Sequence, residues 1–307
     1  MHWFIWLLPL LSGAADALCR VFIKTSKIHR LTLIAGGYLF ALPFYVAWLM
    51  WEGIPETNLA FWKTIVIHVP LLTFANVLFV EAHRRSSLIV VSAYMSFVPA
   101  FSLLYSPWVG GRPTLWGYIG VGVIVCGVYV LNVRTEHVGW AAPFKAAWKD
   151  VGARFIIAAT FILGATSNLD YLALINSNGP FFLLVDHGLI MVVTMAVAGM
   201  YMVFGKVPRQ EFFHRGIVRP LAGYGLVLAA SVILHLLAFR WIPIVSYVIA
   251  GKRCGAIFSA VAFGVFLGFV AKRQDFQKER EELRYRIPGI LLMIAGMIVI
   301  ILWGRRS

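Results

Sequence analysis

The segment IPIVSYVIAGKRCGAIFSAVAFGVFLGFV, from Ile242 to Val270, is long and apolar enough to cross a bilayer, yet it carries Lys252 and Arg253 near its middle. About 20 apolar residues span the hydrocarbon core, so the segment is typical of a transmembrane helix. A cation at the centre of such a helix costs about 2.5–3.5 kcal/mol and usually faces a cavity or a bundle interior. The pair therefore indicates either an ion or substrate path, or a structural pair neutralised by carboxylates of neighbouring helices.

The composition of the whole chain is also typical of a membrane protein. Of its 307 residues, 61% are hydrophobic and only 13% are charged, which lies outside the range of soluble domains. The formal net charge is +14, but the cations gather in short segments between apolar runs, where they orient helices and meet anionic lipids. The basicity therefore gives no evidence for a nucleic-acid partner, and we expect membrane lipids as the surroundings.

The cysteines and the N-terminal segment do not indicate a disulfide-rich, metal-binding or secreted protein. Cys19, Cys126 and Cys254 lie in apolar runs and share no close spacing, so neither a disulfide framework nor a metal site is indicated. No cofactor is expected. The start of the chain, residues 1–17, has an apolar core like a signal peptide but lacks a positively charged leader, and we expect it to be retained as a first helix.

The chain contains ten apolar segments, which predict an all-α polytopic membrane protein with ten transmembrane helices. They cover residues 3–23, 31–50, 64–82, 86–106, 115–133, 155–175, 181–204, 221–239, 242–270 and 287–303. Pro43 is expected to break the second of them. The amphipathic segment 134–154 is predicted to lie along the membrane surface as a linker, and the charged segment 271–286 is predicted to form a solvated surface helix.

An internal repeat supports this organisation. GVGVIVCGVYVLN from Gly120 matches GILLMIAGMIVII from Gly289, and each places two glycines seven residues apart, Gly120 with Gly127 and Gly289 with Gly296. Such glycines allow close helix approach. Each run closes a half of five helices, residues 1–133 and 155–307. Repeats with an odd number of helices insert in opposite orientations, the architecture in which secondary transporters bind substrate at the midplane and alternate access.

Two runs carry a resemblance to a known family. SLIVVSAYMSFVPAFSLLYSPWVGGRPTLWGYIGVGVIVCGVYVLN resembles the fourth and fifth helices of EamA-type members of the drug/metabolite transporter superfamily. YVIAGKRCGAIFSAVAFGVFLG, followed by RIPGILLMIAGMIVII, resembles the ninth and tenth. The resemblance covers essentially the whole chain, and its motifs identify the fold well and the substrate poorly. Where the family commonly has Gly-Glu after the fourth and ninth helices, this chain has Gly111-Arg112 and Gly268-Phe269.

A narrower resemblance concerns the two central cations. In plastid sugar-phosphate translocators of the same superfamily, an adjacent Lys-Arg pair on the ninth helix holds substrate phosphate, and Lys252-Arg253 is similar to that pair. The resemblance implies a small anionic substrate, phosphorylated or carboxylated. Arg suits bidentate contact with such groups, while Lys serves as a point charge. We expect Arg20, Tyr94 and Tyr247 to complete the substrate site.

Further ionisable residues lie within the spans or at their ends. Asp16 and Arg20, four residues apart, share a helix face and form either a local ion pair or part of a cavity. The residues assigned to coupling or charge pairing are Asp16, Asp170, Asp186, His187 and Glu81. For the three aspartates, a proton or counter-ion site and simple pairing with Arg20 or Lys252 both remain open. Glu81, His83, Arg84 and Arg85 are predicted to form a tight charged hairpin after the third span, either an interfacial anchor or, through His83, Arg84 and Arg85, the entrance for an anionic substrate.

Other function classes fit less well. A membrane enzyme usually needs clustered carboxylates or a paired His, and the only neighbour pair is Asp186-His187, whose side chains point about 100° apart on a helix. We therefore predict that the chain is not an enzyme. The alternatives within transport are a flippase for a lipid-linked phosphate sugar and an exporter of amino acids or drugs. A non-transporting membrane subunit would leave the buried charges unexplained, and a homodimer stays open.

The distribution of cations predicts an orientation in the membrane. Nineteen of the 27 Lys and Arg residues lie in the loops after the first, third, fifth, seventh and ninth spans, and five lie in the other loops and at the termini. Positive-inside bias then puts both termini outside a plasma (inner) membrane. The family resemblance implies the opposite, with termini inside. We follow the charge distribution.

Overall fold

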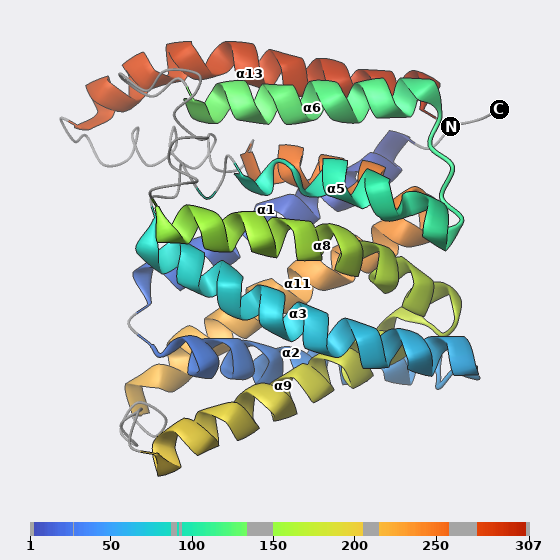
Figure 1. The fold of residues 1–307 in the computed structure, drawn as a ribbon, viewed down its shortest axis with the longest axis vertical. Helices are drawn as coiled ribbons and strands as arrows, with labels where there is room; N and C mark the ends of the chain where they lie inside the picture. Colours follow the sequence, from blue (N-terminus) through green and yellow to red (C-terminus); the bar gives the residue numbers. More distant parts are fainter. Residues whose placement is uncertain are drawn as a thin grey trace.

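The computed structural model describes residues 3–26, 28–86, 91, 94–133, 150–204, 215–257 and 275–304. These residues form helices joined by short connections, and none of them is in a strand (Figure 1). Within them, six helices are long and apolar enough to cross a membrane. These are Phe4–Ile23, Arg30–Glu52, Leu59–Arg85, Val151–Ile175, Gly179–Val203 and Val218–Trp241. The all-α, multi-pass character predicted from the apolar segments is confirmed.

The elements follow the predicted order of spans. The first part of the chain contains η1 (Trp3–Trp6), α1 (Leu7–Thr25), α2 (Arg30–Glu52), α3 (Leu59–Arg85), α5 (Val98–Tyr105), η2 (Ser106–Val109) and α6 (Leu115–Val133). The second part contains α8 (Val151–Ile175), α9 (Gly179–Val203), η3 (Arg215–Ile217), α11 (Val218–Trp241) and α13 (Asp275–Trp303). Residues 245–257 are also helical. The remainder of the predicted spans 86–106 and 242–270 lies largely outside the described residues.

Two boundary predictions are wrong. Helix α2 continues through Pro43 instead of breaking there. Proline is tolerated in such helices because neighbouring helices re-satisfy the freed backbone groups. Helix α3 continues through His83, Arg84 and Arg85, so these residues form its last turn and not a hairpin.

The connecting segments also differ from the prediction. Asp150 caps α8 by accepting a hydrogen bond from the Gly152 amide at 2.8 Å, so residues 151–154 belong to the helix and not to a linker. The rest of the linker, 134–149, lies outside the described residues. Residues 275–286 are helical as predicted, but they are continuous with the last span in α13.

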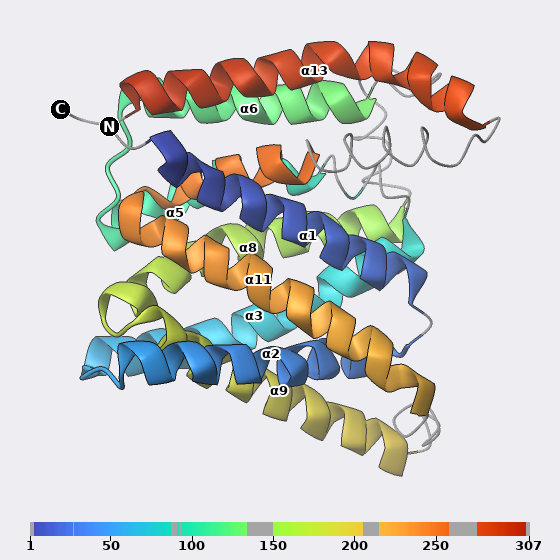
Figure 2. The same cartoon turned by 180° about the vertical axis from the view of Figure 1, so that it is seen from behind.

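The helices pack in pairs that join distant parts of the chain (Figures 1 and 2). Helices α6 and α13 form one outer layer, and α2 and α9 form the opposite one. Between these layers α3 packs on α8, and α1 packs on α11. Each pair is antiparallel. In α1 and α11, for example, the Ser12 hydroxyl donates to the Ser231 carbonyl at 2.7 Å and Phe22 lies against Gly223.

The matched glycines lie at a close helix contact. A Cβ added to Gly120 would lie 2.9 Å from the Gly296 carbonyl oxygen, and one added to Gly127 would lie 2.7 Å from the Gly289 carbonyl oxygen. This pairing makes α6 and α13 antiparallel and confirms the predicted close approach. Without a side chain between them, the two backbones meet directly, as in other small-residue membrane contacts.

A second glycine contact joins α1 to helix 245–257. A Cβ on Gly13 would lie 1.9 Å from the Lys252 carbonyl oxygen, and a Cβ on Gly255 would lie 2.0 Å from the Leu10 carbonyl oxygen. Only glycine fits at these two positions. The contact brings Asp16 and Arg20 of α1 beside the two central cations.

Polar contacts fasten the helix ends on two opposite sides. At one end Arg30 pairs with Glu81 at 2.7 Å, and the Ser86 hydroxyl donates to Asp150 at 2.6 Å. At the other end the Asn58 side-chain amide donates to Asn176 Oδ1 at 2.7 Å. The start of α2, the end of α3 and the start of α8 therefore lie at the same end.

Candidate functional site

A cavity of about 170 Å³ lies between the helices. Its walls come from α1, α2, α3, α8, α9, α11 and helix 245–257, together with Met95 and Val98, so both parts of the chain contribute. Pockets for drug-sized ligands usually measure about 300–1,000 Å³. In this conformation the cavity therefore suits a compact chemical group.

One wall of the cavity carries an excess of positive charge. The Asp16 carboxylate accepts from Arg20 Nη2 at 2.6 Å and lies 3.4 Å from Arg253 Nη1. Lys252 forms no ion pair among the described residues, although it lines the same cavity. Arg253 is only 8% exposed, and its Nε has no acceptor within the described part of the chain. Two cations thus share the Asp16 carboxylate, and a third lies on the same wall without an ion pair among the described residues.

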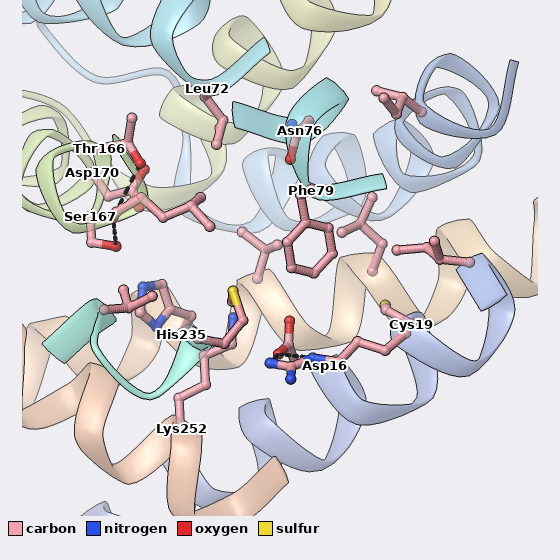
Figure 3. A pocket seen from close by; sticks show the side chains of 18 of the residues that line it. Asp16, Cys19, Leu72, Asn76, Phe79, Thr166, Ser167, Asp170, His235 and Lys252 are labelled. Atoms are coloured by element: carbon pink, nitrogen blue, oxygen red, sulfur yellow. Dashed lines mark hydrogen bonds and ion pairs between the residues drawn. The ribbon is translucent and has the colours of Figure 1, made fainter. Parts of the chain in front are cut away.

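The facing wall contains a histidine between two aspartates. His68 Nδ1 lies 2.7 Å from Asp186 Oδ1, and its Nε2 lies 2.9 Å from Asp170 Oδ1. His68 and Asp186 side chains are fully buried, whereas Asp170 lines the cavity and is 20% exposed. We call these three residues the His68 triad. Figure 3 shows Asp170 and Asn76 across the cavity from Asp16 and Lys252.

Asp186 and His187 have different partners, as their positions on a helix predicted. His187 Nδ1 lies 2.9 Å from the Tyr45 hydroxyl, and its ring packs 4.4 Å from the Tyr38 ring. Tyr38 in turn accepts a hydrogen bond from Asn76 at 2.7 Å. These contacts hold α2, α3 and α9 together next to the cavity.

The structure brings together only part of the predicted site. Six of its residues line the cavity: Asp16, Arg20, Asp170, His187, Lys252 and Arg253. Tyr94 and Tyr247 are buried away from its lining, and the Tyr247 hydroxyl donates to the Gly304 carbonyl at 3.0 Å. Asp186 lies behind the wall, bound to His68.

The charged residues at the end of α3 lie outside the cavity lining. Glu81 pairs with Arg30 and with Arg85, whose Nε lies 2.5 Å from Glu81 Oε1. Arg84 donates to the Ile28 carbonyl oxygen, and His83 Nδ1 lies 2.8 Å from the Phe79 carbonyl oxygen. The contacts with Arg30 and Ile28 join the end of α3 to the start of α2 and the residues before it.

Sequence reasoning did not assign His68 to the site. The available signal was a histidine in the middle of an apolar span, where polar side chains are costly and mark functional positions. Other polar or reactive lining residues were also missed: Cys19, Asn76, Thr166, Ser167 and His235. Their residue types are common on packed helix faces, so nothing in the sequence distinguished them.

Long apolar helices packed around a charged cavity define a polytopic membrane protein. Residues 2–133 match the EamA-like transporter family, which confirms the resemblance to the drug/metabolite transporter superfamily for this part of the chain. The match points to a membrane transporter rather than an enzyme. A crystal structure of a protein that is 13% identical covers 99% of this chain and 97% of its own, with a TM-score of 0.65, and shows a shared fold. A search of curated proteins finds no match.

Proposed function

We propose that the protein is a secondary transporter that moves a small anionic metabolite, phosphorylated or carboxylated, through the central cavity by alternating access. The observation that carries the proposal is the excess of positive charge on one cavity wall, where Arg20 and Arg253 share Asp16 and Lys252 lines the same cavity. A buried cation without a full set of partners is costly. An anion in the cavity would supply the missing partner.

The ligand would bind through two complementary groups. Lys252 offers a point charge with three donors, and the Arg253 guanidinium offers directed donors to a planar or tetrahedral anion. Neighbours on a helix diverge by about 100°, so both can border one cavity only if it lies between them. The cavity lining contains both residues, which meets this condition. Arg20 on α1 would hold Asp16 in place and add to the positive field.

The proposed architecture is ten spans in two inverted repeats. The third helix of each half packs on the first helix of the other, as α3 on α8 and α11 on α1. The two second helices, α2 and α9, pack together, and so do the two fifth helices, α6 and α13. A pseudo-two-fold axis that exchanges the halves accounts for all four contacts. Rocking of the halves about the cavity would then expose it to either side in turn.

A thermal-shift screen of the purified protein tests the proposed substrate class. The panel contains sugar phosphates, small carboxylates, amines and polyprenyl phosphates. We expect anions to raise the melting temperature and amines to leave it unchanged, because a ligand that binds only the folded state stabilises it. Stabilisation by polyprenyl phosphates alone would favour a lipid flippase, and stabilisation by amines alone would contradict the anion site.

The proposed orientation places the basic helix ends in the cytoplasm and both termini outside a plasma (inner) membrane. Arg30, Arg84 and Arg85 gather at this end, as the positive-inside rule requires. We expect an alkaline phosphatase fused after Ser307 to be active in bacterial cells and a fluorescent protein fused there to stay dark. The opposite pair of results would place the termini inside.

A further inference from the structure

The contacts of His68 favour two protons within the triad. Nδ1 is hydrogen-bonded to Asp186 Oδ1 at 2.7 Å, while Nε2 lies 2.9 Å from Asp170 Oδ1 in an ion-pair contact without hydrogen-bond geometry. A neutral imidazole has one N–H and one lone pair, and a lone pair that faces an ionised carboxylate is repelled by it. The geometry is therefore satisfied either by an imidazolium between two carboxylates or by a neutral imidazole with one protonated carboxyl. Both forms hold two protons and have a net charge of −1.

The triad also joins the two halves of the chain. His68 comes from α3, in the half that closes with α6, whereas Asp170 and Asp186 come from α8 and α9. Loss of the second proton would change the net charge of the triad from −1 to −2 and leave a nitrogen lone pair against a carboxylate. The side chains of His68 and Asp186 are fully buried. Solvent therefore screens this repulsion only weakly. The one-proton triad therefore favours separation of α3 from α8 or α9.

One member of the triad gives the proton a route to the cavity. Asp170 is 20% exposed and lines the cavity, whereas the other two members are fully buried. A proton on His68 Nε2 can pass to Asp170 Oδ1 and from there to the cavity. Other titratable or charged groups near the triad are His187 with Tyr45 and Tyr38 behind Asp186, and Asp16, Arg20, Lys252, Arg253 and His235 across the cavity.

We propose that Asp170, His68 and Asp186 form a proton-binding site that links proton uptake to anion binding, so that protons and the anion cross the membrane together. This proposal rests on the proposed function. The sign of the linkage between proton uptake and anion binding follows from charge. An anion beside Lys252 and Arg253 adds negative charge to the cavity that Asp170 lines, which favours the two-proton triad. By reciprocity, the two-proton triad favours anion binding to the same extent.

A native cysteine provides a test that needs no substrate. Cys19 lines the cavity, so its alkylation by N-ethylmaleimide reports access to the cavity. Cys126 and Cys254 are replaced by serine, and the alkylation rate is followed by mass spectrometry over a range of pH. We compare this protein with the same protein carrying Asp186→Asn. An asparagine amide can donate to His68 Nδ1, so a neutral imidazole with its proton on Nε2 satisfies both neighbours, and no second proton is needed.

The expected result is a ratio of rates, which cancels the intrinsic reactivity of the thiol. As pH rises, the rate in the protein with Asp186 should increase by about fivefold or more relative to Asp186→Asn, the lower range of typical coupling between sites. Asp170→Asn should remove the pH response in the same way and serves as a second variant if the first does not fold. Asp150→Asn, which changes the cap of α8 outside the cavity, should retain the response.

A pH response that persists unchanged in folded Asp186→Asn and Asp170→Asn would overturn the proton site. A separate experiment tests the proposed function. Inorganic phosphate and small carboxylates, added at high pH, should slow Cys19 alkylation, and Lys252→Gln should abolish this effect. A triad-dependent pH response without any Lys252-dependent effect of these anions would keep the proton site and overturn the anionic substrate.

Discussion

Replacing Lys252 by Gln should weaken anion binding by about 10- to 100-fold, the equivalent of the 1.5–3 kcal/mol of a charge-assisted contact. Lys252 lines the cavity and has no ion-pair partner among the described residues, so its charge is available to a ligand. Membrane insertion should be unchanged or improved, because the substitution removes a cation from the membrane interior. The measurement is the affinity of the purified variant for the anion that stabilises the wild type most.

Two further variants separate charge from structure. Lys63→Gln makes the same change at an exposed position on α3 and should leave anion affinity unaltered. Arg253→Lys keeps the charge but loses the guanidinium fork, and it should also weaken binding if the contact is bidentate. If folded Lys252→Gln and Arg253→Lys both bind the anion normally, the two cations are a structural element and do not hold the anion.

Replacing Gly13 by Ala should destabilise the protein by about 1–3 kcal/mol or more, the cost of adding a methylene group to a packed interior. The new Cβ would lie 1.9 Å from the Lys252 carbonyl oxygen and 2.6 Å from the Ala256 nitrogen. These are backbone atoms, which cannot rotate away as a flexible side chain can. Helices α1 and 245–257 would have to separate, and the ion pair between Asp16 and Arg253 would be lost with them. Melting temperature and the yield of monodisperse protein after extraction measure the effect.

Gly122→Ala is the matched control for this prediction. Gly122 is also helical, but a Cβ added there meets no atom of a neighbouring side chain or helix within 4 Å in the described part of the chain. The change should be neutral or stabilising by up to about 1 kcal/mol, since alanine has the higher helix propensity. Equal melting temperatures for the Gly13 and Gly122 variants would show that the contact between α1 and helix 245–257 is looser than the structure has it.

The sequence by itself determined the all-α, multi-pass character of the chain and the position of most helices among the described residues. A transmembrane helix satisfies all its backbone hydrogen bonds within one segment, so length and hydropathy suffice to find it. Leu115–Val133, for example, has the predicted bounds. The close contact at the paired glycines could also be predicted from the sequence, because their seven-residue spacing places both glycines on one helix face. The charges of Lys252 and Arg253 stood out because a cation inside an apolar run is rare.

The tertiary structure alone decided which polar groups meet. His68 lies between Asp170 and Asp186, more than 100 positions away, and this depends on how deeply and at what rotation α3 packs against α8 and α9. Hydrophobic periodicity gives the buried face of a helix only coarsely, and in these helices lipid and protein neighbours are both apolar. Tyr247 therefore could not be distinguished from a cavity residue by its position. Its hydroxyl bonds to Gly304, while Lys252, five residues on, faces the cavity.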